Sequence, residues 1–106
     1  ALSTALRILQ LTLERDGTSG RPGSIVFSVA ELECLQMLQP VYEGSTVQQK
    51  NPFPVNSLAW GAWTIGRMGG WKGYKNAAPA GPITMKRGLN IFNHLFTGWQ
   101  LQKMCA

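Results

Sequence analysis

The feature that most constrains the fold of this chain is a series of apolar runs with helical spacing. Glycine and proline residues separate these runs. The longest run follows Pro82, a residue suited to the first helical position, and continues to about Met104. It carries one apolar stripe and, beside it, a second stripe that has glycine at both ends. The first stripe is Met85, Leu89, Phe92, Phe96 and Trp99, and the second is Gly88, Ile91, Leu95 and Gly98. A surface helix needs one stripe for its own core, so the second is available to a neighbour.

The neighbour of this second stripe is either another helix of the same chain or the same helix of a second subunit. Small residues permit a close helix crossing in both cases, and a crossing on a two-fold axis pairs identical surfaces. Periodicity does not choose between the two arrangements, so both remain open at this point.

Two shorter helices are predicted in the first part of the chain. The first covers Leu2 to Arg15 and ends at a run of small polar residues. The second begins at Ser28, because Ser28 and Glu31 have the spacing of a capping box. Pro40 cannot continue the helical hydrogen bonding, which predicts an end near Gln39.

A third short helix is predicted after the polar, proline-containing loop 43–56. Asn56 or Ser57 caps it, it runs from Leu58 to Met68, and two glycines close it. The chain of 106 residues suits one domain. We therefore expect an all-α fold in which about four helices form an irregular bundle with basic loops rich in glycine and proline.

Charge is distributed unevenly along the chain. All five acidic residues precede residue 44, where three basic residues leave a balance of −2. Seven basic residues and no acid follow, a balance of +7. Such asymmetry indicates an anionic partner such as DNA, and the alternative is charge dispersed over a solvated surface.

The segment after the third helix alternates aromatic and basic residues. Its lysines suit contacts to nucleic-acid phosphates, whereas Trp71 and Tyr74 suit either base contacts or packing at the end of the bundle, and for Trp71 we favour packing. The predicted DNA contacts are Arg67, Lys72, Lys75, Lys86 and Arg87.

Groups for catalysis are scarce in the sequence. The one histidine, His94, has no acid near it, and the glycines after residue 68 lack the Gly-Lys-Ser/Thr ending of a phosphate loop. No carboxylate follows Glu43, which disfavours a hard-metal site there. We expect a non-catalytic chain with no metal, cofactor or small-molecule ligand of its own.

The expected compartment is the cytoplasm. No apolar run approaches the ~20 residues that span a bilayer, and the opening residues lack the pattern of a signal peptide. Cys34 and Cys105 show no metal-site spacing, so both are expected to be reduced thiols.

Two stretches carry a resemblance to a known family. "SLAWGAWTIGRMGGWKGY" (57–74) and "GPITMKRGLNIFNHLFTGWQL" (81–101) resemble the C-terminal end of bacterial cut-and-paste transposases of the insertion-sequence-four and transposon-five group. "ALRILQL" (5–11) and "VFSVAELECLQML" (26–38) look like the helix leaving the catalytic core and the helix after it. The opening without methionine also suggests a piece of a longer protein.

The resemblance implies a role in assembly. In this family an RNase H-like domain carries three metal-binding carboxylates, with Mg or Mn expected, and the C-terminal helices join two transposase molecules that hold the transposon ends. Residues 1–106 would be that C-terminal domain, with the catalytic domain upstream of residue 1. The last helix would form a homodimer through Gly88, Ile91, Leu95, Gly98, Trp99 and Gln102. The alternative is an accessory helical module that binds DNA without sequence preference.

Overall fold

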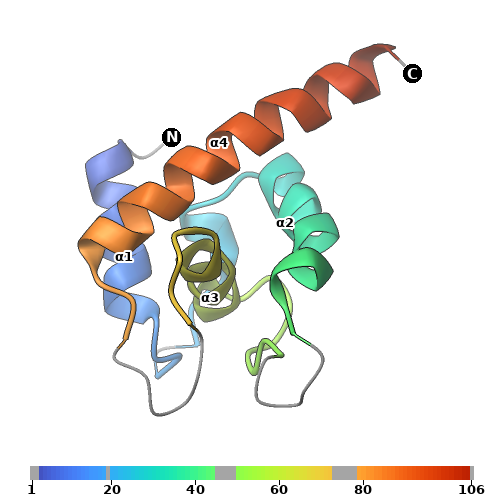
Figure 1. Cartoon of the computed structure of the whole chain (residues 1–106). Helices are drawn as coiled ribbons and strands as arrows, with labels where there is room; N and C mark the ends of the chain where they lie inside the picture. The colour runs from blue at the N-terminus through green and yellow to red at the C-terminus, as the bar shows by residue number, and fades with distance from the viewer. Residues whose placement is uncertain (1–2, 19, 45–49, 73–78, 106) are drawn as a thin grey trace.

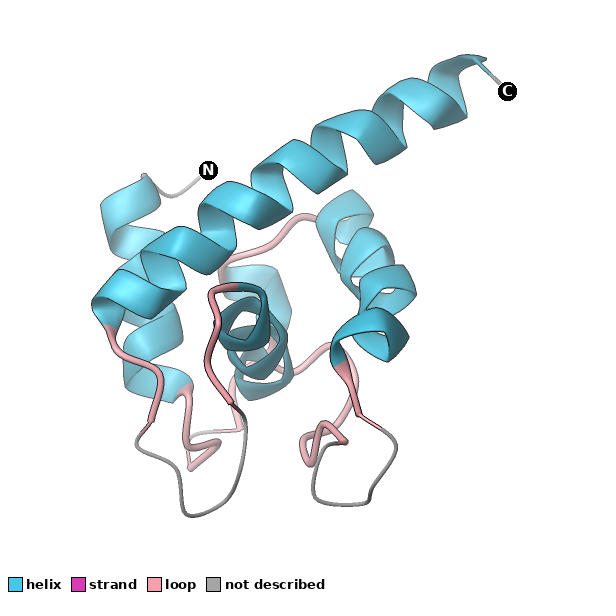
Figure 2. Ribbon diagram, viewed as in Figure 1, coloured by secondary structure: helices cyan, strands magenta, loops and turns pink. Residues whose placement is uncertain are grey.

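The computed structural model describes residues 3–18, 20–44, 50–72 and 79–105. In these residues the chain forms four α-helices and one 3₁₀ turn, and no strand, so the predicted all-α fold is confirmed (Figure 2). The elements are α1 (Thr4–Glu14), η1 (Gly23–Ile25), α2 (Val29–Tyr42), α3 (Leu58–Met68) and α4 (Pro82–Cys105).

The helix α3 lies in the middle of the molecule, with α1 and α2 on either side and α4 across the top (Figure 1). Every residue of α3 except Arg67 is buried. Bulky and small side chains alternate along it: a Cβ atom at Gly61 would lie 2.7 Å from the ring of Phe27, and one at Gly66 would lie 3.2 Å from Trp71. The glycines therefore let neighbouring rings reach the helix backbone, which offsets their low helix propensity.

The first apolar stripe of α4 packs into the core of the bundle. Met85, Leu89 and Phe92 are fully buried, and Phe92 meets Phe27 edge to face at 5.9 Å between ring centroids. Phe96 and Trp99 are only partly buried. The contact with the core thus weakens toward the C-terminus, and Figure 1 shows the last turns of α4 extending past α2.

The start of α2 follows the prediction, but its end does not. Glu31 N donates to Ser28 Oγ at 3.1 Å and Ser28 N donates to Glu31 Oε1 at 2.9 Å, so the capping box is present. The predicted end near Gln39 is wrong, because the helix continues through Pro40 to Tyr42. Pro40 is exposed in the last turn of the helix. Because proline has no N–H, the carbonyl of Gln36 has no helical donor, but Gln36 is exposed and its carbonyl can bond to water.

The ends of α3 and α1 agree closely with the sequence patterns. Ser57, rather than Asn56, caps α3, since Ser57 Oγ accepts a hydrogen bond from Trp60 N at 3.1 Å. Gly70 ends the helix with a φ of 98°, a conformation that favours glycine. The helix α1 begins at Thr4 after the cap residue Ser3, and the predicted start at Leu2 lies outside the described residues.

The apolar stripe that predicts α1 is directed away from the core. Leu6, Leu9 and Leu13 are 47%, 50% and 61% exposed, whereas Leu11 is fully buried. The periodicity therefore located the helix but not its inward face.

Candidate functional site

The close crossing of α3 and α4 is made by two glycines. A Cβ atom at Gly88 would collide with the carbonyl oxygen of Ile65, and one at Gly69 would collide with the carbonyl oxygen of Thr84. Each helix thus lies against the backbone of the other. Gly88, assigned above to the dimer interface, is buried at this crossing and is not available to a second subunit. The alternative of a neighbour within the same chain accounts for this residue.

The rest of the second stripe lies on the surface. Ile91 and Leu95 are 36% and 39% exposed, and Gln102 is also exposed. Gly98 is exposed, and a Cβ atom placed there would meet nothing within 4 Å. These four residues form one flank of α4, which is called here the α4 flank.

Trp99 attaches this part of α4 to α2. Its indole Nε1 donates to Met37 Sδ at 3.2 Å, and its ring stacks on Phe96 with centroids 5.8 Å apart. Lys103 Nζ lies 4.3 Å from the centre of the Trp99 ring and 3.6 Å from Glu33 Oε2. Of the predicted interface residues, Trp99 therefore joins the chain's own helices and also borders the α4 flank.

Arg67, a predicted DNA contact, bonds within the chain. Its Nε donates to the carbonyl oxygen of Tyr42 at 3.0 Å, and its Nη1 donates to the carbonyl oxygens of Trp71 and Lys72 at 2.8 and 2.9 Å. The guanidinium also lies over the Trp63 ring. Arg67 thus connects the end of α2 to the segment after α3.

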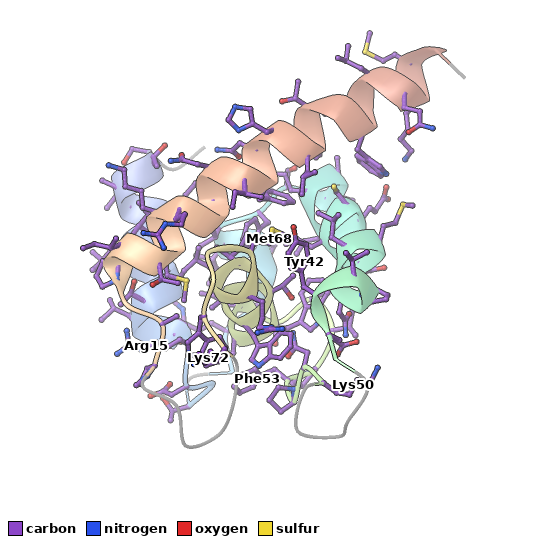
Figure 3. All side chains as sticks on the ribbon, viewed as in Figure 1. Arg15, Tyr42, Lys50, Phe53, Met68 and Lys72 are labelled. Atoms are coloured by element: carbon purple, nitrogen blue, oxygen red, sulfur yellow. The ribbon has the colours of Figure 1, made fainter. Side chains whose placement is uncertain are left out.

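The other basic candidates differ in exposure and partners. Lys72 and Lys86 are exposed and have no acidic partner among the described residues. Arg87 is exposed, with Nη1 3.4 Å from the carbonyl oxygen of Gly69. Lys75 lies outside the described residues. Lys50, which sequence reasoning did not select, is exposed at the same end of the molecule as Lys72 (Figure 3).

The acidic residues are mostly engaged within the chain. Three ion pairs join Arg7 to Glu31 at 2.8 Å, Arg21 to Glu14 at 3.6 Å, and Lys103 to Glu33 at 3.6 Å. Glu43 accepts hydrogen bonds from Asn51 N and Gln39 Nε2. Asp16 is exposed, and its hydrogen bonds from Thr18 N and Thr18 Oγ1 lower the pKa of its carboxyl. The acids therefore leave Lys72, Lys86 and Arg87 without local neutralisation.

The aromatic ring of Trp71 packs at the end of α3. It meets Trp63 edge to face at 6.2 Å between centroids and covers Gly66. This is the packing that we favoured for Trp71, whereas Tyr74 lies outside the described residues.

Residues with catalytic or metal-binding chemistry are scattered. His94 is exposed, with Nδ1 2.8 Å from the carbonyl oxygen of Asn90 one turn earlier. Across the residues that the structure describes, no three His, Cys, Asp or Glu side chains are grouped as metal ligands. Cys34 is buried, and burial followed by the charge of Glu31 raises the pKa of its thiol.

None of the described helices is long and apolar enough to cross a bilayer. Comparison of the chain with protein-family models, curated proteins and solved structures finds no match.

Proposed function

We propose that this chain is the dimerisation and synapsis module of a DNA transposase, in which α4 pairs with α4 of a second copy. The observation that carries the proposal is Gly98. A glycine inside a helix costs about 1 kcal/mol relative to alanine, and among the residues that the structure describes no atom requires a glycine at this position. A second helix that crosses close to Gly98 would leave no room for a side chain, and glycine would then be required at this position.

The surroundings of Gly98 support the same proposal. Ile91 and Leu95 place partly exposed aliphatic side chains on the same flank, and the end of α4 extends beyond the other helices. A small residue with aliphatic neighbours suits a close helix crossing on a two-fold axis. Pairing of DNA ends follows from the family resemblance, which assigns the catalytic carboxylates and their Mg or Mn to another part of the parent protein.

The test is the molar mass by light scattering over a wide concentration range at two salt concentrations. Gly98→Leu is expected to weaken the dimer by filling the crossing, and Asn90→Leu, on an exposed position of the same helix, is the matched control. A dimer insensitive to salt that Gly98→Leu disrupts supports the proposal. A monomer at every concentration, or a dimer that Gly98→Leu leaves unchanged, contradicts it.

An accessory DNA-binding function is the second candidate, and the distribution of ion pairs favours it. Three of the five acids pair with Arg7, Arg21 and Lys103. No described acid pairs with Lys72, Lys86 or Arg87, so these exposed cations keep their positive potential. Phosphate contacts by these residues would give an affinity that falls steeply with salt and ignores base sequence.

Fluorescence anisotropy with duplexes of unrelated sequence tests this second function. Lys72→Ala combined with Lys86→Ala is expected to weaken binding to every duplex and to reduce the slope against salt by about two. Arg21→Ala, which removes a cation already paired with Glu14, is the control. An absence of binding at low salt would exclude the accessory function.

A further inference from the structure

We infer that the surface contacted by a second copy of this chain extends from the α4 flank onto α2, where it includes Met37 and Val41. The inference rests on the proposed dimerisation and names the surface that completes it. Sequence periodicity gave no reason to select either α2 residue, because both stand outside the line of apolar residues with helical spacing, Val29, Leu32, Leu35 and Leu38.

The α4 flank alone offers too little surface for a stable dimer. Ile91 and Leu95 are only 36% and 39% exposed, and Gly98 has no side chain to bury. A standard interface buries roughly 800 Å² on each partner and uses about 20 to 30 residues per side. Additional apolar surface must therefore adjoin the flank if two copies are to associate stably.

The outer row of α2 supplies such surface. Met37 is 65% exposed and Val41 is 72% exposed. They are four residues apart, so they lie on the same side of the helix, one turn from each other. Met37 Sδ accepts the hydrogen bond from Trp99 Nε1 at 3.2 Å, and Trp99 follows Leu95 by one turn of α4. The row on α2 thus begins at Trp99, which borders the α4 flank.

Contacts between the helices present the two surfaces together. Lys103 pairs with Glu33 and lies over the Trp99 ring, so the end of α4 is attached to α2 at two successive turns. A surface with a set orientation loses less freedom when a partner binds than one on a detached helix. The two helices therefore present one preorganised surface.

The charge distribution of this surface suits a second copy of the same chain. The residues of this surface carry no charge: Ile91, Leu95 and Gly98 on α4, and Met37 and Val41 on α2. A two-fold contact places the same patch on both sides of the interface, so an uncharged patch avoids repulsion between like charges. The charged Glu33 and Lys103 lie at its border and neutralise each other.

The exposed leucines of α1 are the competing surface. Leu6, Leu9 and Leu13 form a row of their own, and nothing in the described structure connects them with Gly98. A variant of α1 therefore belongs in the same experiment.

The experiment measures the dimer dissociation constant of the whole chain by light scattering. Val41→Lys is expected to raise it at least tenfold, as is Gly98→Leu. Ile83→Lys introduces the same charge at an equally exposed apolar position at the other end of α4 and is expected to leave it unchanged. Circular dichroism melting verifies that each variant is folded.

The possible outcomes separate this inference from the proposed function. A dimer weakened by Gly98→Leu but not by Val41→Lys overturns the extension onto α2 and leaves dimerisation through α4 standing. A dimer weakened only by Leu9→Lys overturns both and assigns the contact to α1. A chain that stays monomeric at every concentration also overturns both.

Discussion

Gly88 of α4 lies directly against the backbone of Ile65 of α3, so that a Cβ atom at Gly88 would approach Ile65 Cγ2 to 2.9 Å and collide with the Ile65 carbonyl oxygen. The second glycine of the same stripe, Gly98, has no such neighbour. Two glycines ten residues apart on one helix thus serve different purposes, the first for contact within the chain and the second, in our proposal, for contact between chains.

We predict that Gly88→Ala lowers the free energy of unfolding by roughly 2 to 3 kcal/mol, because α3 and α4 must separate to admit the methyl group. Gly98→Ala is the matched control and is expected to be neutral or stabilising by up to about 1 kcal/mol in the monomer, since alanine is the better helix former. Urea denaturation at low protein concentration measures both. Equal effects would contradict the crossing described for α3 and α4.

We predict that Arg67 stabilises the fold rather than contacting DNA directly. Arg67→Ala removes three hydrogen bonds to backbone carbonyls and is expected to cost roughly 2 kcal/mol. Arg67→Lys should recover little of this, because an ammonium cannot reproduce the planar arrangement of donors. Lys72→Ala, at an exposed neighbour, should change stability by less than about 0.5 kcal/mol. An Arg67→Ala protein of unchanged stability would contradict the structural role.

We predict that Glu31 contributes more to stability than the rest of its capping box. Its Oε1 accepts from Ser28 N and its Oε2 from Arg7 Nη2, and both charged side chains are about 15% exposed. Glu31→Ala would leave the Arg7 guanidinium without an anion and is expected to cost roughly 3 kcal/mol, against about 1 kcal/mol for Ser28→Ala.

The exposed pair of Glu33 and Lys103 provides the comparison for Glu31. Glu33→Ala should cost less than about 1 kcal/mol, because side chains that remain 54% and 59% exposed gain little from pairing. Thermal or urea unfolding of the three variants ranks them. A cost for Glu31→Ala no larger than that for Glu33→Ala would show that Arg7 does not depend on this carboxylate.

We predict that the Cys34 thiol is protected from reagents in the folded protein. It is 1% exposed, and burial, together with the charge of Glu31, raises its pKa above the ordinary value of 9.0. In a Cys105→Ser background, Ellman's reagent should react more than about a hundredfold more slowly with the native protein than with the unfolded protein. Equal rates would contradict its burial.

The raised pKa of Cys34 also sets the sign of a pH effect. The folded state holds the thiol proton more tightly than the unfolded state does. Its contribution to stability is therefore complete below pH 9.0 and is lost as the pH rises through the higher pKa of the folded state. Cys34→Ala should flatten this alkaline decrease in the free energy of unfolding.

The helices themselves follow from the sequence, because their signals are local. The capping box at Ser28, Pro82 at the first turn of α4, and Gly69 with Gly70 after α3 each act within one turn of the chain. The prediction that α2 ends near Gln39 was wrong because Pro40 removes only one helical hydrogen bond, and an exposed last turn tolerates its loss. Charge asymmetry, too, is a property of composition and needs no coordinates.

The use of each helix face was decided only by the tertiary structure. The leucines of α1 have the periodicity of a core stripe and face outward, while Gly88 and Gly98 share one stripe and lie in different surroundings. Arg67 and Lys86 carry the same charge, but only Arg67 donates to carbonyl oxygens both at the end of α2 and in the segment after α3. Periodicity reports which residues share a face, whereas what covers that face depends on contacts between residues distant in the chain, and these form only when the helices pack.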